Sequence, residues 1–300
     1  MSKGALKNIK IYGGLQPTPE DKRDIRFGAL YALPELVELP PAFRLPVMGI
    51  KDQKDSDLCA AFAGTLASEI QEDTVFSPEY QFAKTKQIIG EYEEWGADLR
   101  SMLKSLVKYG SLPLEKVPPE LRYNGKNRNA IANWANWSPL YDMIAAKFKK
   151  GSYLKVSGEY DLFDNIRATI YANRKEERLV ITGAVWKHDW TTSRDGIVED
   201  KPLRSGQGFG HAFCISGWEY FRGSPHLVAV LSNGESVGRD GYYFLPRGLV
   251  NRELVWGAYT IRDINPEAAK MLVKYGFSAR FEWLANFVMA IKTIFNFNVR

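Results

Sequence analysis

Residues 47–70 place a cysteine at the point where a polar loop becomes a helix. The residues from Asp52 to Asp57 are mostly turn-forming and show no apolar periodicity, whereas small and apolar residues follow from Ala60 onward. This change predicts a loop followed by a buried helix over about residues 58–72. A thiol in the first turn of a helix lies near the positive end of the helix dipole, which stabilises its thiolate. Cys59 is therefore a candidate nucleophile.

Cys59 also has a simpler interpretation as a small core residue, because a lone cysteine among alanines is usually buried without a chemical role. Three other polar residues favour chemistry. Gln53 precedes the cysteine on the approach loop, His211 follows a glycine-rich stretch, and Asn233 ends an apolar run. An activated thiol requires a general base and a group that orients that base. The four residues together indicate a thiol-based catalytic site.

The chain order glutamine, cysteine, histidine, asparagine resembles that of papain-like peptidases. The segment IKDQKDSDLCAAFAGTLASEI resembles the active-site segment of that family, GHAFCISGWEY its histidine strand, and LSNGESVGRDGYYFLPRG its asparagine strand. The likeness is greater to the bacterial and phage branch of the papain superfamily, which lacks the long inhibitory pro-domain. It extends over roughly residues 12–263.

The resemblance implies an α+β two-lobe fold with a helical left lobe, an antiparallel β-barrel-like right lobe and an active-site cleft between them. It also implies the role of each site residue. Cys59 is the nucleophile, His211 the general base and Asn233 the residue that orients the imidazole. The oxyanion donors are the Gln53 side chain and the Cys59 main-chain N–H. The implied substrate-binding residues are Trp95, Gly96, Ala97 and Gly210.

Two positions depart from the pattern of the family. Ala60 stands directly after the cysteine, where the family commonly has an aromatic residue, and Glu235 stands where it has a tryptophan two residues after the asparagine. Hydrogen bonds are stronger in surroundings of low dielectric constant. These two departures therefore predict a less shielded histidine–asparagine pair and a reduced or restricted activity.

The rest of the sequence divides into three parts. Residues 1–45 are rich in proline and are predicted to form an extended N-terminal segment, of a length compatible with a short strap over the cleft. Residues 46–265 form the peptidase-like domain, with a helical lobe over about 46–175 and a β lobe over about 176–265. Residues 266–300 form an apolar C-terminal helical extension.

Caps and periodicity place the elements within the domain. Ser77 followed by Pro78 predicts one helix start, and Asp98 predicts another for a helix that ends at Gly110. Two more helices are predicted over residues 139–150 and 162–173. The predicted strands span residues 178–186, 211–220, 227–232, 242–245 and 258–261.

Charge and cysteine content narrow the function. The net charge is +5 and the isoelectric point about 9.0, but basic and acidic residues are interspersed, so no nucleic-acid partner is expected. Cys59 and Cys214 are too few for a disulfide framework, and the histidines and cysteines lack metal-ligand spacing, so no metal or cofactor is expected. No signal peptide or transmembrane segment is recognised, which favours a cytoplasmic or phage- or virion-associated protein.

Three functions remain open from the sequence. The first is a cysteine endopeptidase acting on a protein or peptide substrate. The second is a papain-fold structural or assembly protein with weak or no activity, docking onto a protein partner through its C-terminal helix. The third is a thiol amidase or acyltransferase. The intact set of Gln53, Cys59, His211 and Asn233 favours the first.

Overall fold

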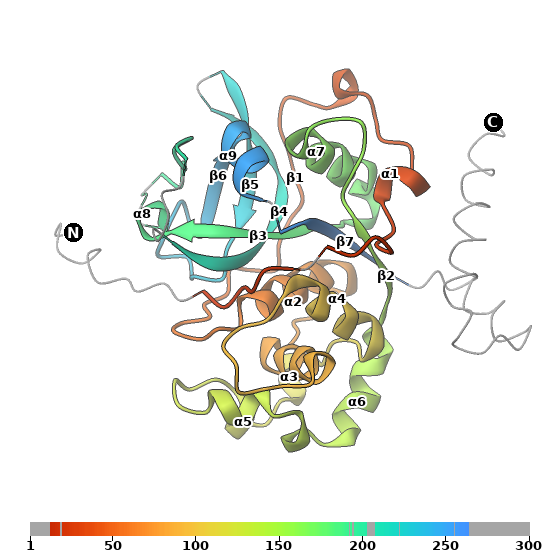
Figure 1. Ribbon diagram of the computed structural model, residues 1–300, viewed down its shortest axis with the longest axis vertical. Coiled ribbons are helices and arrows are strands. Elements are labelled where there is room, and N and C mark those ends of the chain that lie inside the picture. Colours follow the sequence, from red (N-terminus) through yellow and green to blue (C-terminus); the bar gives the residue numbers. More distant parts are fainter. Residues whose placement is uncertain are drawn as a thin grey trace, which may run out of the picture.

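The computed structural model describes residues 13–18, 20–191, 193, 195–202, 208–221, 223–254 and 256–263. A group of helices lies on one side of the molecule and a twisted sheet on the other, and α2 (Cys59–Glu72) lies where the two meet (Figure 1). This arrangement confirms the predicted α+β fold with two lobes. The predicted C-terminal helical extension lies outside the described residues.

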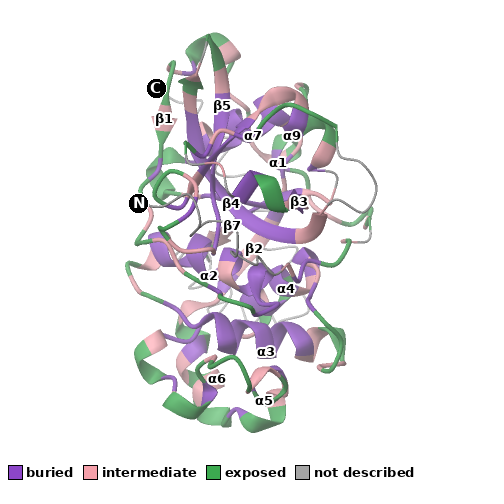
Figure 2. Cartoon of the chain, turned by 90° about the vertical axis from the view of Figure 1, so that its left-hand side faces the viewer, coloured by how far each residue is buried: buried purple, intermediate pink, exposed green. Residues whose placement is uncertain are grey.

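The helical lobe is built around α2, α3 (Pro78–Ile89) and α4 (Leu99–Lys108). The caps expected from the sequence are present: the Ser77 hydroxyl accepts the N–H of Tyr80, and the Asp98 carboxylate accepts the N–H of Ser101. Nearly every residue of α2 is buried, as the purple ribbon in Figure 2 shows. Its small side chains let neighbouring elements approach closely, so the helix can serve as the central element of the domain.

Two further helices complete this lobe. They are α5 (Arg128–Ala132) and α6 (Pro139–Ala145), and short 3-10 turns connect the elements across the chain. Those turns are Leu36–Glu38, Leu114–Lys116, Pro119–Leu121, Trp134–Asn136, Ala146–Phe148 and Arg174–Glu176.

The helix predicted over residues 139–150 is too long. It ends at Ala145, and Lys150 instead begins β2 (Lys150–Lys155), a strand that the sequence analysis missed. This strand exists because its main chain pairs with β7 (Ala258–Asp263). The buried Lys150 ammonium also forms ion pairs with Glu72 of α2 and Asp263 of β7, at 2.6 and 2.5 Å. The strand therefore links the two lobes.

The β lobe is an antiparallel sheet with the strand order β2-β7-β3-β4-β5-β6, and β1 pairs with the outer half of β4. The remaining strands are β1 (Phe43–Arg44), β3 (Val180–Lys187), β4 (Gly208–Phe221), β5 (Ser224–Val230) and β6 (Tyr242–Pro246). The remaining helices are α1 (Phe27–Leu30), α7 (Leu162–Ala172), α8 (His188–Thr191) and α9 (Arg247–Glu253). α7 and α9 contact each other and strands of the sheet. They lie on the part of the sheet that is away from the helical lobe (Figure 1).

In the part of the chain that the structure describes, no helix combines the length and the apolar character needed to cross a lipid bilayer.

Candidate active site

The thiol and the imidazole come from the two elements that meet at the lobe interface. Cys59 is the first residue of α2, and His211 lies near the start of β4, where it pairs with Ala184 of β3. Both side chains are fully buried. The main-chain N–H of Ala212, the neighbour of His211, faces the Cys59 sulfur. The packing of α2 against β4 thus brings together two residues that are far apart in the sequence.

Gln53 and Asn233 are held together by main-chain pairing between their segments. Asp52 and Asn233 form an antiparallel bridge, and the Gln53 N–H donates to the Ser232 carbonyl at 2.8 Å. The Gln53 side chain accepts the Ser232 hydroxyl hydrogen at 2.5 Å and donates to the Ser56 carbonyl at 2.8 Å. The loop before α2 is therefore joined to the segment that follows β5.

The His211 and Asn233 side chains interact, but without the geometry of an ordinary hydrogen bond. Among the residues that the structure describes, neither ring nitrogen has a partner, and Asn233 Oδ1 also has none. Burial lowers the pKa of His211 to about 4, an effect that the nearby Asn233 side chain opposes. The imidazole is therefore neutral at neutral pH.

The predicted lack of shielding of the histidine–asparagine pair is not observed, because the His211 ring nitrogens and Asn233 Oδ1 are buried, whereas the reduced activity stays a prediction. The Trp186 ring of β3 lies 6.4 Å from the His211 ring, and the Phe209 ring lies 6.0 Å from it, measured between centroids. Trp186 of the neighbouring strand β3 and Phe209 of β4 itself thus supply the aromatic surroundings that Ala60 and Glu235 do not. The Trp186 contact could not be predicted from the sequence, because it depends on the register of β3 with β4.

The thiol is also neutral, contrary to the expectation of a stabilised thiolate. Burial raises the pKa of Cys59 to about 11, and the Asp57 carboxylate adds to the increase. The N–H groups of Ala212, Gly14 and Ala60 act in the opposite direction but do not outweigh the burial. The start of α2 would stabilise a thiolate, but the burial of the sulfur has the larger effect on the pKa of Cys59.

The cover is the N-terminal segment itself. Residues 13–16, here called the strap, run between the two lobes (the dark red start of the described ribbon in Figure 1). The Gly14 N–H points at the Cys59 sulfur at 3.4 Å. The Leu15 N–H donates to the Gly210 carbonyl at 3.1 Å. An extended stretch of polypeptide therefore closes the thiol off from solvent.

The strap also lies along the residues that the sequence analysis assigned to substrate binding. Ala97 donates its N–H to the Gly14 carbonyl at 2.8 Å and accepts the Gln16 N–H at 3.0 Å. The Trp95 indole donates to the Gly13 carbonyl at 2.8 Å. The Gly14 carbonyl oxygen lies so close to Gly96 that a Cβ there would be only 1.8 Å from it. The structure thus brings Trp95, Gly96, Ala97 and Gly210 together around one bound chain.

Beyond the strap, the N-terminal segment is fixed to the body. Arg100 of α4 forms an ion pair with Asp24 at 2.5 Å, and both side chains are largely buried. The main chain of Arg26 forms a parallel β-bridge with that of Lys155 in β2, and Phe27 is fully buried. The strap is therefore held at its downstream end by an anchor outside the cleft.

Asp57 and Arg128 are residues of this region that the sequence analysis missed. Asp57 is buried two positions before the thiol, and its carboxylate pairs with the Arg128 guanidinium at 2.7 Å. Asp57 stands in a run with Asp52 and Asp55, and nothing in that run distinguishes the buried carboxylate from the exposed ones.

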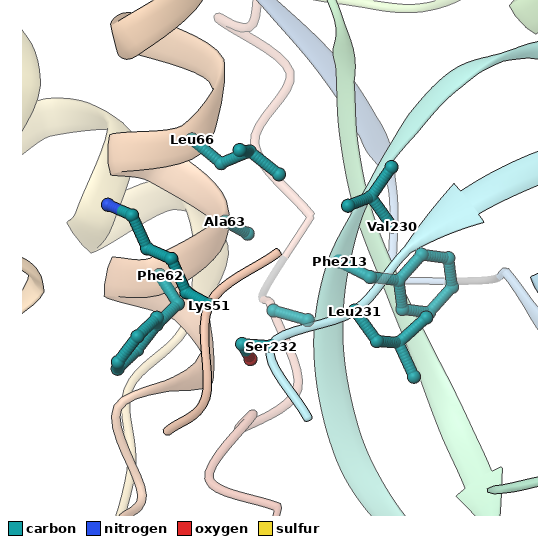
Figure 3. Close-up of a pocket in the computed structure, with 9 residues that line it drawn as sticks. Lys51, Phe62, Ala63, Leu66, Phe213, Val230, Leu231 and Ser232 are labelled. Atoms are coloured by element: carbon teal, nitrogen blue, oxygen red, sulfur yellow. The ribbon is translucent and has the colours of Figure 1, made fainter. Parts of the chain in front are cut away.

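A separate pocket opens between α2 and the sheet (Figure 3). Apolar side chains from both lobes line most of it, and the Lys51 ammonium is already paired with Glu69. Its lining residues include no cysteine, histidine or carboxylate. The lining residues are Lys51, Phe62, Ala63, Leu66, Ala212, Phe213, Val230, Leu231 and Ser232.

No three His, Cys, Asp or Glu side chains of the described residues gather where they could hold a metal ion.

A helical lobe, an antiparallel sheet and a cysteine at the start of the helix between them define the papain-like fold. No family model matches the sequence, and no curated protein matches it either. Among solved structures, xylellain, a cysteine protease from Xylella fastidiosa, is similar with a TM-score of 0.65 and 21% identity, covering 85% of this chain and 96% of its own.

Two proenzymes show the same fold. Procathepsin B S9 from Trypanosoma congolense has a TM-score of 0.63 and 15% identity, with 84% of this chain and 87% of that chain covered. Digestive procathepsin L 3 from the larval midgut of Tenebrio molitor has a TM-score of 0.58 and 14% identity, with 80% and 74% covered. At these low identities it is the structural similarity that shows a shared fold, that of papain-like cysteine proteases.

Proposed function

We propose that this chain is a papain-like cysteine endopeptidase that hydrolyses peptide bonds in protein or peptide substrates. One observation carries the proposal. An extended chain, residues 13–16, lies against the Cys59 sulfur with its main chain hydrogen-bonded to Ala97 and Gly210. A cleft that binds main-chain groups on both sides of a thiol is suited to an extended polypeptide of varied sequence.

In the proposed reaction, the Cys59 thiolate attacks the carbonyl carbon of the scissile bond. His211 takes the thiol proton and later gives it to the departing amine, while Asn233 accepts the other ring N–H and so fixes the orientation of the imidazole. The Cys59 N–H and the Gln53 amide stabilise the oxyanion. Water then hydrolyses the thioester and restores the thiol.

The strap itself is not in a position to be cleaved. A substrate must place a carbonyl carbon next to the sulfur, whereas the strap places the Gly14 N–H there. Activity therefore requires the strap to leave the cleft. When it leaves, the thiol regains contact with water, and the burial that raises its pKa is relieved.

The alternative is a papain-fold structural or assembly protein with little activity. The absence of a well-formed hydrogen bond between the described His211 and Asn233 side chains and the neutral thiol favour this alternative as long as the strap stays in place. The docking of a partner on the C-terminal helix and the association with a phage or virion remain predictions.

The test uses the full-length chain with Gly14→Val, a substitution that has no room for its Cβ in the cleft, because Asp57 O would lie 2.1 Å away. The variant is incubated with a peptide mixture and, separately, with an epoxysuccinyl inhibitor, and both reactions are read by mass spectrometry. We expect peptide cleavage and a single adduct, and we expect to lose both in Gly14→Val combined with Cys59→Ala. A folded variant whose thiol reacts with iodoacetamide but gives neither result would favour the structural alternative.

A further inference from the structure

A buried ion pair joins the start of α2 to a distant part of the helical lobe. The Asp57 carboxylate is fully buried, and the Arg128 side chain is 12% exposed. Arg128 Nε lies 3.2 and 3.1 Å from the two carboxylate oxygens, and Nη2 lies 2.7 Å from Oδ2. A buried carboxylate requires such a partner, and without one its burial is strongly unfavourable.

The other N–H groups of the guanidinium hold the loop that leads to the cleft wall. Nη1 donates to the carbonyls of Tyr92 at 2.5 Å and Glu93 at 3.1 Å, and Nη2 donates to the carbonyl of Glu94. Arginine has five N–H donors in one plane, whereas lysine has three on a single nitrogen. One arginine can therefore fix three consecutive carbonyls and a carboxylate at the same time.

The same carboxylate also holds the wall directly. Asp57 Oδ2 accepts the Gly96 N–H at 2.6 Å, with Gly96 at φ +76°. This bond turns the Gly96 amide toward α2. The next residue, Ala97, then presents its N–H and carbonyl to the cleft, where they pair with Gly14 and Gln16 of the strap.

We propose that Asp57 and Arg128 form a clamp that positions the wall at residues 95–97 for any extended chain in the cleft, whether the strap or a peptide substrate. Neither residue touches a reacting atom, so both are positioning residues. The part that concerns the substrate rests on the proposed peptidase function. The part that concerns the strap does not, because it can be measured through the accessibility of the thiol.

Arg128→Lys separates positioning from charge. The lysine keeps a cation near Asp57 but cannot hold the three loop carbonyls. Arg122→Lys is the matched control, because Arg122 lies six positions before Arg128 and donates to the carbonyls of Val117 and Leu114, away from the cleft. Circular dichroism confirms that each variant is folded.

Two measurements are made with the full-length chain. With Gly14 unchanged, we expect iodoacetamide to alkylate Cys59 about tenfold faster in Arg128→Lys than in the natural chain, because the strap loses well-positioned hydrogen bonds to residues 95–97. In the Gly14→Val background, we expect the KM for a fluorogenic peptide with several residues before the scissile bond to rise about tenfold and kcat to change less than about threefold. The Arg122→Lys control changes neither quantity.

Alkylation of Arg128→Lys at the rate of the natural chain would overturn the clamp, whether or not any variant cleaves peptides. Faster alkylation without peptide cleavage by any variant would support the clamp for the strap and overturn the proposed function. A loss in kcat at constant KM would overturn the positioning role toward substrate. If Arg128→Lys does not fold, Asp57→Asn replaces it, because a neutral amide oxygen binds Arg128 and the Gly96 N–H less strongly. Loss of the Asp57 charge also lowers the pKa of the Cys59 thiol, so the alkylation rates are then compared per thiolate from a series of pH values. We expect the same increase per thiolate, and no increase would overturn the clamp.

Discussion

Displacing the strap by a single substitution gives the most direct test of the closed site. A Cβ on Gly14 would lie 2.1 Å from the Asp57 carbonyl oxygen and 2.7 Å from the Asp57 Cα. These atoms belong to the buried backbone directly before α2, which cannot move away at low cost in a closely packed interior. In Gly14→Val the strap must therefore leave the cleft.

The expected size of the effect follows from the acidity of the thiol. Burial raises the pKa of Cys59 from 9.0 to about 11. Restoring the ordinary value would increase the thiolate fraction at pH 7.5 by about 100-fold, since each pKa unit changes that fraction tenfold. Because the thiolate is the reactive form, alkylation by iodoacetamide should become faster by about this factor, and removal of the steric cover adds to it.

The assay follows the alkylation by intact mass over a series of pH values, with Cys59→Ser to identify the modified residue. Cys214 serves as an internal reference, since burial raises its pKa even further and its S–H donates a hydrogen bond to the Ala63 carbonyl at 3.1 Å. Gly217→Val is the matched control, because its Cβ would also meet a main-chain carbonyl oxygen, that of Phe43 at 2.0 Å, but where β1 pairs with β4, away from the strap and its anchor. The reasoning is refuted if folded Gly14→Val reacts no faster than Gly217→Val.

Three further predictions concern the site and the lobe interface. In the Gly14→Val background, Gln53→Ala should lower kcat/KM about 100-fold, because an oxyanion donor is lost. The alkylation rate of Cys59 should change less than about threefold. An unchanged kcat/KM would contradict this role of Gln53. The pKa of His211 is lowered from 6.5 to about 4, so the neutral imidazole contributes about 3 kcal/mol to the free energy of unfolding above pH 6.5, and this contribution is lost as the pH falls to 4. In His211→Gln, the free energies of unfolding measured with urea at pH 7 and pH 4 should therefore differ less than in the natural chain. An equal difference would disprove this prediction. Lys150→Ala should lower the free energy of unfolding by about 2 kcal/mol, less than for a fully enclosed pair because both carboxylates are partly exposed, and an unchanged urea midpoint would rule out its role between the lobes.

Local sequence patterns were sufficient for most elements of the fold. Ser77 and Asp98 mark helix starts because their side chains bond to N–H groups only three residues further on. The two-lobe fold follows from the family resemblance, which rests on the chain order of Gln53, Cys59, His211 and Asn233. The prediction of the helix end at Ala145 is wrong, because the following strand, β2, forms by pairing with β7, which lies about 110 residues further along the chain.

The tertiary structure decided the state of the site. Residue types and spacing named a nucleophile and a base, but only packing shows that the strap covers the sulfur, so that a thiol at a helix start has a raised pKa. Arg128 meets Asp57 across 71 positions of sequence, and Trp186 reaches His211 through the register of β3 with β4. Burial and pairing of charges depend on all the neighbours of a side chain in space, whereas a sequence pattern records only those along the chain.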